Sequence, residues 1–387
     1  MNVIKRICQH AQWRKELQEW AEPIARRTGL SADWIIADCE AFWRDHAVRR
    51  EEYDELSLCT QPAALRDNFL GLNEQRVYLD YLNPKKYYIF SRNKYFAHLL
   101  FEKKGLRKAE LYGCYWPEGL PSVDEEIVTD LRGVLEALRK KQVSRFVVKA
   151  TEQSHGENVR VVDSIDYQPE DALLHYSDGS VQPLSAILGA EPLVFESVVK
   201  QTAQFAAFNP SSVNTVRFMT LLYPDGEARI IATFVKIGRS GRCVDNAGGG
   251  GNVDACINTE TGALEYAIQY DGMDKIRDID CHPDTHAQLN GVIVENWEAI
   301  KAEVLRFQQA FPYCKAAGWD IAITDEGPVV IEVNDFWDRT GQVFIRRGWR
   351  REIRDCYLAW KATGREWVMG RESNKLSDRL IAKIIQQ

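Results

Sequence analysis

The segment that most constrains the fold is residues 318–334, where apolar and polar residues alternate on both sides of a short turn. Such alternation predicts two antiparallel strands that turn one face toward a core. The Asp-Glu-Gly turn in the middle predicts a three-residue loop, because glycine supplies the positive φ that such loops need. Thr324 is then expected to pair with Pro328. This register places Asp320 directly opposite Glu332.

The polar face of this hairpin predicts a metal site, because Asn334 lies two residues after Glu332 and shares its face. Two carboxylates directly opposite each other repel, and a hard cation between them removes the repulsion. Oxygen atoms from Asp320, Glu332 and Asn334 suit Mg²⁺, which commonly binds through few carboxylates and the phosphates of a substrate. A hairpin whose polar face simply meets water is the alternative interpretation. The apolar residues expected to face the core are Ile321, Ile323, Val329, Ile331 and Val333.

The rest of the chain predicts an α+β fold with mainly antiparallel sheets. Residues 1–90 have the apolar spacing of helices, and Ser31 is the expected N-cap of one of them. Further helices are expected at residues 93–104, 124–141 and 294–311. Segments with a period of two predict strands at residues 145–150, 158–162, 193–199, 215–223 and 228–237.

Composition and charge exclude several classes of protein. Apolar residues make up 45% of the chain and charged residues 27%, which is ordinary for a globular protein with a real core. A net charge of -7 disfavours nonspecific binding to nucleic acid or to an anionic membrane. No stretch reaches the roughly 18 uncharged apolar residues of a membrane span, and the N-terminus lacks the apolar region of a secretory signal. The nine cysteines form no C-x-x-C pair, so we expect reduced thiols in a cytoplasmic protein and no zinc site.

Motifs of several other enzyme classes are missing from the chain. It has neither a G-x-x-x-x-G-K-S/T phosphate loop nor the G-x-S-x-G elbow of a hydrolase. The strand that contains Lys149 invites comparison with protein kinases, but no H-R-D or D-F-G element follows it. These absences argue against the commonest phosphate-binding and hydrolytic sites.

Three motifs resemble those of a known superfamily. The D-x11-E-x-N pattern of the hairpin resembles the magnesium site of ATP-grasp proteins. The runs at residues 214–220 (Asn-Thr-Val-Arg-Phe-Met-Thr) and 235–251, which ends in four glycines, resemble the branch called sugar-transfer-associated ATP-grasp proteins. The similarity covers about residues 94–342. It implies an ATP-grasp fold, in which two α+β lobes grip ATP, behind a helical N-terminal region.

The resemblance also implies a division of the chain. Residues 1–90 form the helical N-terminal region, and residues 91–198 form a first lobe with a phosphate loop and a hinge. Residues 199–345 form a C-terminal lobe with the magnesium site, and residues 346–387 form a tail with helices. The basic run at residues 346–351 in that tail is either a solvated patch or an attractor of an acidic substrate.

The nucleotide-binding residues follow from the same resemblance. Lys94 and Lys149 are expected to hold the phosphates, because a dry polyphosphate site needs fixed cations. Ser154, His155 and Gly156 lie in a loop where exposed backbone amides would cradle an anion. A plain hairpin loop is the alternative for this segment.

The segment at residues 193–201 resembles the hinge that holds adenine, with a buried strand end as the alternative. Adenine is usually read there by backbone groups, so Val198 and Val199 are expected to contact it. Glu196 is the expected side-chain ligand, and Gln201 is the candidate ligand of the ribose.

The candidate catalytic residues are three cations, Arg217, Lys236 and Arg239. Arg217 and Lys236 fall on neighbouring strands of an expected antiparallel pair. Cations there would reach the γ-phosphate or an acyl phosphate, where they stabilise developing charge.

The reaction that the resemblance implies is ATP-dependent ligation. A substrate carboxylate attacks the γ-phosphate of ATP, and an amine or another nucleophile captures the resulting acyl phosphate. The implied cofactors are ATP with Mg²⁺ or Mn²⁺, and the implied partners are a small-molecule carboxylic acid and a nucleophilic acceptor. The branch name suggests a link to polysaccharide or sugar-conjugate biosynthesis. The alternatives are an ATP-dependent kinase of a small molecule or sugar, and a nucleotide-binding protein without turnover.

Overall fold

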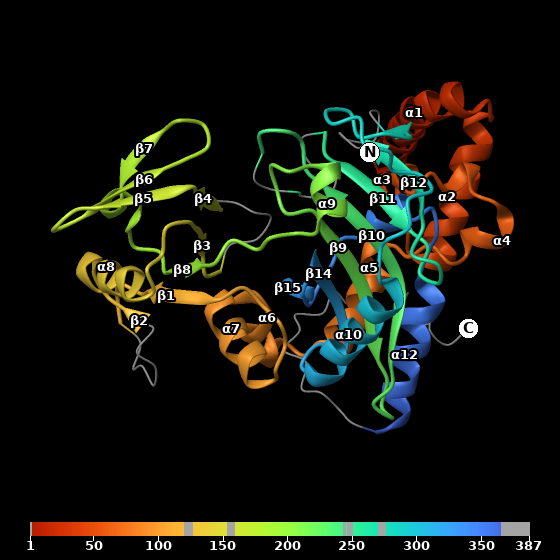
Figure 1. Ribbon diagram of the computed structural model, residues 1–387. Coiled ribbons are helices and arrows are strands. Elements are labelled where there is room, and N and C mark those ends of the chain that lie inside the picture. Colours follow the sequence, from red (N-terminus) through yellow and green to blue (C-terminus); the bar gives the residue numbers. More distant parts are fainter. Residues whose placement is uncertain are drawn as a thin grey trace. The chain divides into compact units, whose positions relative to one another are not determined.

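The computed structural model describes residues 2–119, 127–152, 159–242, 245, 251–269 and 276–364, with side chains from residue 12 onward. Helices and mainly antiparallel sheets are intermixed, as the sequence predicted (Figure 1). The chain divides into two compact units, one formed by residues 1–81 with 338–387 and the other by residues 82–337. None of the described helices has the length and apolar character needed to cross a membrane.

The first unit is helical. Its helices are α1 (Asn2–Thr28), α2 (Ala32–His46), α3 (Arg50–Glu55), α4 (Ala63–Arg66), α5 (Leu72–Leu82), α11 (Gly341–Phe344) and α12 (Arg350–Ala362). Ser31 caps α2 as predicted, because its Oγ accepts a hydrogen bond from the Trp34 amide at 3.2 Å. Leu17 and Ile24 of α1 are buried, whereas Trp13 of the same helix is exposed. The apolar spacing therefore located the helix but not the environment of every apolar residue.

Both ends of the chain contribute to this unit. The Gln342 side chain accepts a hydrogen bond from the Leu70 amide at 2.9 Å and donates one to the Leu70 carbonyl at 3.0 Å. Gly348 lies so close to Asn68 that an added Cβ would sit 2.0 Å from the Asn68 carbonyl oxygen. The N-terminal helices are thus completed by residues from the last part of the chain.

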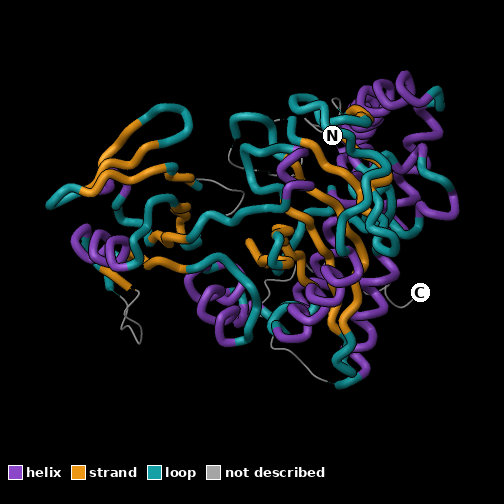
Figure 2. Tube along the Cα trace, in the orientation of Figure 1, coloured by secondary structure: helices purple, strands orange, loops and turns teal. Residues whose placement is uncertain are grey.

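The second unit contains a seven-stranded antiparallel sheet with the strand order β13-β12-β11-β10-β9-β14-β15, whose strands run side by side in Figure 2. The strands are β9 (Thr215–Leu222), β10 (Ala228–Ile237), β11 (Val253–Ile257), β12 (Leu264–Gln269), β13 (Arg277–Ile279), β14 (Ala316–Thr324) and β15 (Gly327–Asn334). Strands β9, β10, β14 and β15 fall where the sequence predicted them. Strands β11 to β13 were not predicted.

One face of this sheet carries the main core of the unit. Helices α7 (Lys94–Lys103), α9 (Ala203–Phe208) and α10 (Trp297–Ala310) contribute side chains to it. The α10 residues Trp297, Ile300 and Val304 are buried, as their spacing predicted. The core residues of the central strands include Val216, Phe218, Val235, Ile237, Trp319, Ile321, Ile323, Val330 and Val333. Because side chains alternate along a strand, the polar residues between them lie on the opposite face.

The hairpin of β14 and β15 differs from the prediction at its turn. Thr324 pairs with Gly327 and not with Pro328, so the loop is one residue shorter than expected. A β-bulge next to Asp320 shifts the register by one residue, and Asp320 still pairs with Glu332. The predicted polar pair is therefore present, although the loop length from which it was predicted was wrong.

The bulge also decides which residues of β15 face the core. Val330 pairs with Ile321 and lies in the core with Val333, whereas Ile331 is half-buried. The expectation that Val329 and Ile331 face this core was wrong, because one extra residue in a strand inverts the alternation beyond it.

A five-stranded sheet in the same unit has the order β2-β1-β8-β3-β4. Its strands are β1 (Leu111–Tyr115), β2 (Ile127–Val128), β3 (Phe146–Ala150), β4 (Arg160–Val162) and β8 (Leu193–Glu196). Helix α8 (Leu131–Lys140) packs on it, and begins later than the predicted residue 124 because β2 precedes it. A small antiparallel sheet of β5 (Ser164–Tyr167), β6 (Ala172–His175) and β7 (Val181–Pro183) was not predicted.

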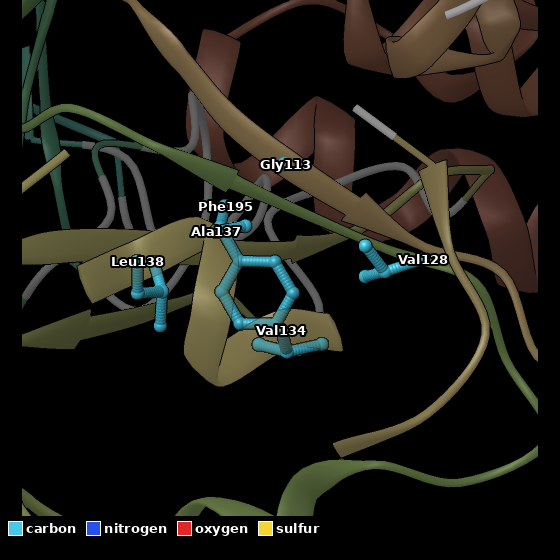
Figure 3. Close-up of a pocket in the computed structure, with 6 residues that line it drawn as sticks. All are labelled: Gly113, Val128, Val134, Ala137, Leu138 and Phe195. Atoms are coloured by element: carbon cyan, nitrogen blue, oxygen red, sulfur yellow. The ribbon is translucent and has the colours of Figure 1, made fainter. Parts of the chain in front are cut away.

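A hollow between α8 and the five-stranded sheet has an apolar lining (Figure 3). Val134 and Leu138 of α8 and Phe195 of β8 point toward one another there. The lining consists of Gly113, Val128, Val134, Ala137, Leu138 and Phe195. Because it offers no polar side chain, this hollow belongs to core packing, and the candidate site lies elsewhere.

Candidate functional site

The polar face of the seven-stranded sheet brings charged residues from four strands together. Glu332 of β15 pairs with Asp320 of β14, and Asp320 pairs in turn with Arg217 of β9. Lys236 of β10 pairs with Thr215, two residues before Arg217 on the same face. Directly paired residues project from one face of a sheet. The strand order therefore gathers residues that are more than a hundred positions apart in the chain.

Asp320 is the centre of this cluster and is buried. Arg217 binds its carboxylate with two hydrogen bonds, from Nε to Oδ1 at 2.7 Å and from Nη2 to Oδ2 at 3.0 Å. The Lys236 Nζ lies 3.0 Å from Oδ1. The Asn334 Nδ2 donates to Oδ2 at 3.3 Å. Two cations and an amide thus surround a single carboxylate.

These contacts set the ionisation of the cluster. Burial favours the neutral form of Asp320, but the charges of Arg217 and Lys236 outweigh burial and lower the pKa of Asp320. Burial likewise disfavours the two cations, and the charge of Asp320, together with that of Asp245 at Lys236, raises the pKa of Arg217 and the pKa of Lys236. The three groups are therefore held as a charged set.

Glu332 has a different environment, although it pairs with Asp320. Its side chain is half-buried and accepts no hydrogen bond from any residue that the structure describes. Burial and the neighbouring charge of Asp320 raise the pKa of Glu332, with Lys94, Lys236 and Arg217 opposing the shift. The oxygens of Glu332 therefore remain available to a ligand.

Asp245 is a further acid of the cluster, and the sequence placed it with Arg239 at the end of a strand near the site. Its Oδ2 accepts hydrogen bonds from the Thr215 amide at 2.8 Å and from the Thr215 hydroxyl at 2.5 Å. The Lys236 Nζ lies 4.0 Å from its Oδ1. Burial raises the pKa of Asp245, and Lys236 opposes the shift. Its place in the 235–251 run was the one sequence signal that pointed to it.

A second charged cluster lies on the five-stranded sheet. The Lys149 Nζ forms an ion pair with Glu196 Oε2 at 2.6 Å, and the His98 Nε2 lies 2.8 Å from Glu196 Oε1. Burial opposes ionisation of Glu196, but the charge of Lys149 and the hydrogen bond of His98 lower the pKa of Glu196 well below its usual value. The structure thus brings together Lys149 and Glu196, which the sequence analysis assigned to phosphate and adenine separately.

His98 was missed by sequence reasoning, although a signal existed. It lies four residues after Lys94, and residues with this spacing share one face of a helix. Because Lys94 is a candidate ligand, its helical neighbour was a candidate as well.

Lys94 connects the two clusters electrostatically. Burial lowers the pKa of Lys94, Glu332 and Glu196 oppose the shift, and the charge of Lys149 adds to it. The Lys94 amide also donates to the Thr151 carbonyl at 2.8 Å. Lys94 therefore interacts electrostatically with both the Glu332 carboxylate and the Lys149 ammonium group.

The remaining predicted residues divide into three groups. Ser154, His155 and Gly156 lie outside the residues that the structure describes. Val198 and Val199 are half-buried and follow the end of β8 at Glu196. The strand expected to reach residue 199 is therefore shorter, and the hinge segment is irregular.

Gln201 and Arg239 have partners of their own. The Gln201 amide nitrogen donates to the carbonyl of Ser212 at 2.8 Å, and its oxygen accepts from the Asn214 amide at 2.9 Å. Arg239 binds Asp284 with two hydrogen bonds, of 2.7 and 2.6 Å. The described contacts thus give both side chains a role in holding turns, and they do not join Arg239 to the Asp320 cluster.

A comparison with protein families identifies the chain. The model of the sugar-transfer associated ATP-grasp family matches residues 73–355. The chain belongs to this family. The resemblance drawn from the sequence is therefore confirmed, and with it the ATP-grasp fold behind a helical N-terminal region.

Solved structures of other ATP-grasp proteins match this chain more distantly. Phosphoribosylamine–glycine ligase from Thermotoga maritima is 15% identical, with 65% of this chain and 49% of that chain covered and a TM-score of 0.36. N5-carboxyaminoimidazole ribonucleotide synthetase from the same organism is 12% identical, with 72% and 52% covered and a TM-score of 0.38. D-alanine–D-alanine ligase from Bacillus anthracis is 12% identical, with 71% and 70% covered and a TM-score of 0.38. The chain spans about half the length of the first two. A search of proteins with curated functions finds no match.

The polar face of this ATP-grasp protein fits a hard divalent cation. Glu332 presents unused oxygens beside Asp320, and a cation there would offset both the burial and the repulsion that raise the pKa of Glu332. The amide oxygen of Asn334 adds a neutral donor of the kind that Mg²⁺ accepts. Among the described residues no group of three or more His, Cys, Asp or Glu side chains is arranged to hold a metal.

Proposed function

We propose that this ATP-grasp protein is an ATP-dependent ligase that activates a carboxylic acid as an acyl phosphate. The observation that carries the proposal is the buried Asp320 between Arg217 and Lys236, next to Glu332 with its available oxygens. This face of the sheet presents carboxylate oxygens that would bind a metal ion, and beside them the two basic side chains that would contact a phosphoryl group. Membership in the family supports the nucleotide part of the proposal.

Each proposed lobe contributes one part of the site. Lys94 and Lys149 of the lobe 91–198 hold the nucleotide phosphates, and Glu196 with the backbone at Val198 and Val199 lies at the adenine. Asp320, Glu332 and Asn334 of the lobe 199–345 are the proposed ligands of Mg²⁺ or Mn²⁺. The bound metal supplies charge neutralisation and a template for the phosphate oxygens. Because the lysines are fixed in place, they neutralise the charge of the phosphates without the help of water.

Arg217 and Lys236 stabilise charge at the reacting phosphoryl group. An oxygen of the substrate carboxylate forms a bond to the γ-phosphorus while the bond to the β–γ bridging oxygen breaks, giving an acyl phosphate and ADP. An amine then attacks the acyl carbon, phosphate leaves with the bonding electron pair, and the amine loses one proton. Preorganised cations at the sites of developing charge lower both barriers. No side chain of the protein needs to act as a nucleophile.

The substrate is proposed only as a chemical class. The family is described by its association with sugar transfer, and we propose that the acid or its acceptor is part of a sugar conjugate. The alternative reaction, phosphoryl transfer to a hydroxyl group, would use the same cations.

Trapping with hydroxylamine tests the proposal. The protein is incubated with ATP, Mg²⁺ and a panel of sugar acids and amino acids, and hydroxamate and ADP are measured. A hydroxamate formed in proportion to ADP supports the acyl phosphate, and Asp320→Asn should abolish both signals. A phosphorylated alcohol without hydroxamate would show a kinase. If calorimetry in the presence of Mg²⁺ detects no binding of a nonhydrolysable ATP analogue to the protein, the proposal that the protein binds ATP is refuted.

A further inference from the structure

The Asp320 carboxylate has no acceptor position left for a metal ion. A carboxylate offers about four lone-pair positions on its two oxygens. Oδ1 is contacted by the Arg217 Nε and the Lys236 Nζ, and Oδ2 by the Arg217 Nη2 and the Asn334 Nδ2. A metal that binds Asp320 must therefore displace at least one of these donors.

The three donors differ in how easily they leave. Arg217 is held by two hydrogen bonds in a planar arrangement, which is the strongest geometry for a carboxylate. Asn334 makes the longest contact and is neutral, so its departure frees a position on Oδ2 but leaves both cations beside the incoming metal. Repulsion between like charges therefore favours the departure of a cation as well. Lys236 makes a single contact with Asp320 and is a point charge on a flexible stem. Of the two cations, Lys236 is therefore the one that a metal ion displaces more easily from Asp320.

A second carboxylate lies ready for the displaced ammonium group. The Lys236 Nζ is already 4.0 Å from Asp245 Oδ1, so a movement of about 1 Å brings it to the length of a charge-assisted hydrogen bond. Asp245 is fixed in place by the amide and the hydroxyl of Thr215. The receiving group therefore does not need to move, and Lys236 keeps an anionic partner in both positions.

We propose that Lys236 and a divalent cation compete for Asp320, and that Asp245 receives the Lys236 ammonium group when the cation binds. This inference rests on the proposed function, because it concerns the metal of the proposed ATP site. It adds that Lys236 holds the place of the metal in the nucleotide-free protein. Free metal then binds weakly, and the Lys236 ammonium group turns from Asp320 to Asp245 when the metal binds.

Titration with Mn²⁺ in the absence of nucleotide tests the exchange, with free Mn²⁺ measured by its electron paramagnetic resonance signal. Lys236→Met should tighten Mn²⁺ binding by about tenfold to hundredfold, the value of one charge-assisted hydrogen bond. Lys236→Arg keeps a competing cation and should bind Mn²⁺ no better than the unchanged protein. Asp245→Asn can still accept from Thr215 but offers no charge to Lys236, so it should weaken Mn²⁺ binding.

Lys94→Met is the matched control, because it removes a positive charge whose field also reaches Glu332. A general electrostatic effect would make Lys94→Met and Lys236→Met alike, and that result would overturn the exchange. Unchanged binding in Lys236→Met, in a protein that still melts cooperatively, would overturn it as well. Failure of the unchanged protein to bind Mn²⁺ even with ATP present would instead refute the proposed function.

Discussion

Asp320 and Glu332 face each other on neighbouring strands, yet their neutral substitutions should affect the metal-free protein in opposite ways. Asp320→Asn removes the charge that balances Arg217 and Lys236, which are themselves largely withdrawn from solvent. Removing one partner of a buried ion pair typically costs about 3–5 kcal/mol, because the other charge stays buried without compensation. Asparagine keeps the shape and one acceptor, so the lower end of this range is expected.

Glu332→Gln should not lower the free energy of unfolding, and at neutral pH it should raise it slightly. No hydrogen bond from a described residue is lost, and the pKa of Glu332 is raised by burial and by Asp320. A carboxyl group whose pKa is higher in the folded state favours folding when protonated, and this contribution is lost as the pH rises through the folded pKa. Glutamine does not ionise, so the variant does not lose stability as the pH rises. The difference from the unchanged protein should disappear below about pH 4, where the unfolded carboxyl is also protonated.

Thermal melts in a chelator at pH 7 and pH 4 measure both effects. For units of this size about 1 kcal/mol corresponds to 2–4 °C, so a cost of about 3 kcal/mol should lower the melting temperature of Asp320→Asn by roughly 6–12 °C. Glu332→Gln should melt at the same temperature or higher. Asp325→Asn in the exposed turn of the same hairpin is the matched control and should change nothing. Equal losses in Asp320→Asn and Glu332→Gln would refute the reasoning, because they would mean that Glu332 also neutralises a buried cation.

Three further substitutions have expected outcomes. Lys149→Ala should weaken binding of a nonhydrolysable ATP analogue by about tenfold to hundredfold in calorimetry, and unchanged affinity would remove Lys149 from the site. Glu196→Gln should lower stability at pH 7, where its carboxylate is paired. Because the folded pKa of Glu196 is lowered, the unfolding free energies of variant and unchanged protein should converge as the pH falls below about 4, and a constant gap would contradict the ion-pair explanation. Gly348→Ala should expose the first unit to limited proteolysis and cost about 3 kcal/mol or more, because its Cβ would collide with Asn68, whereas Gly189→Ala meets no atom within 4 Å and should be neutral.

The hairpin illustrates how much of the site the sequence contained. The pairing of Asp320 with Glu332 was predicted correctly from a loop that was one residue too long, because the bulge compensated for the error. Turn lengths and bulges are decided by backbone geometry on the partner strand, and a single strand's residues do not reveal them. The consequence for the core was a real error, since Val330 took the place that Ile331 was expected to fill.

The partners of the predicted residues were outside the reach of sequence patterns. Arg217 and Asp320 meet because β9 lies between β10 and β14, and strand order is a tertiary property. Lys149 and Glu196 meet for the same reason, since β3 and β8 are neighbours. Periodicity identified which residues are polar on a buried strand, but not which of them neutralise one another.

The construction of the first unit from both chain ends has a consequence for synthesis. Residues 338–364 supply Gln342 and Gly348, which bind against Leu70 and Asn68. Residues 82–337 emerge from the ribosome before them, and at roughly 5–20 residues per second this takes on the order of tens of seconds. During that time the N-terminal helices exist without the segment that completes them, while the second unit already has its whole sequence. Residues 2–81 are therefore synthesised before residues 82–337, but they can complete their packing only after residues 338–364 have been made.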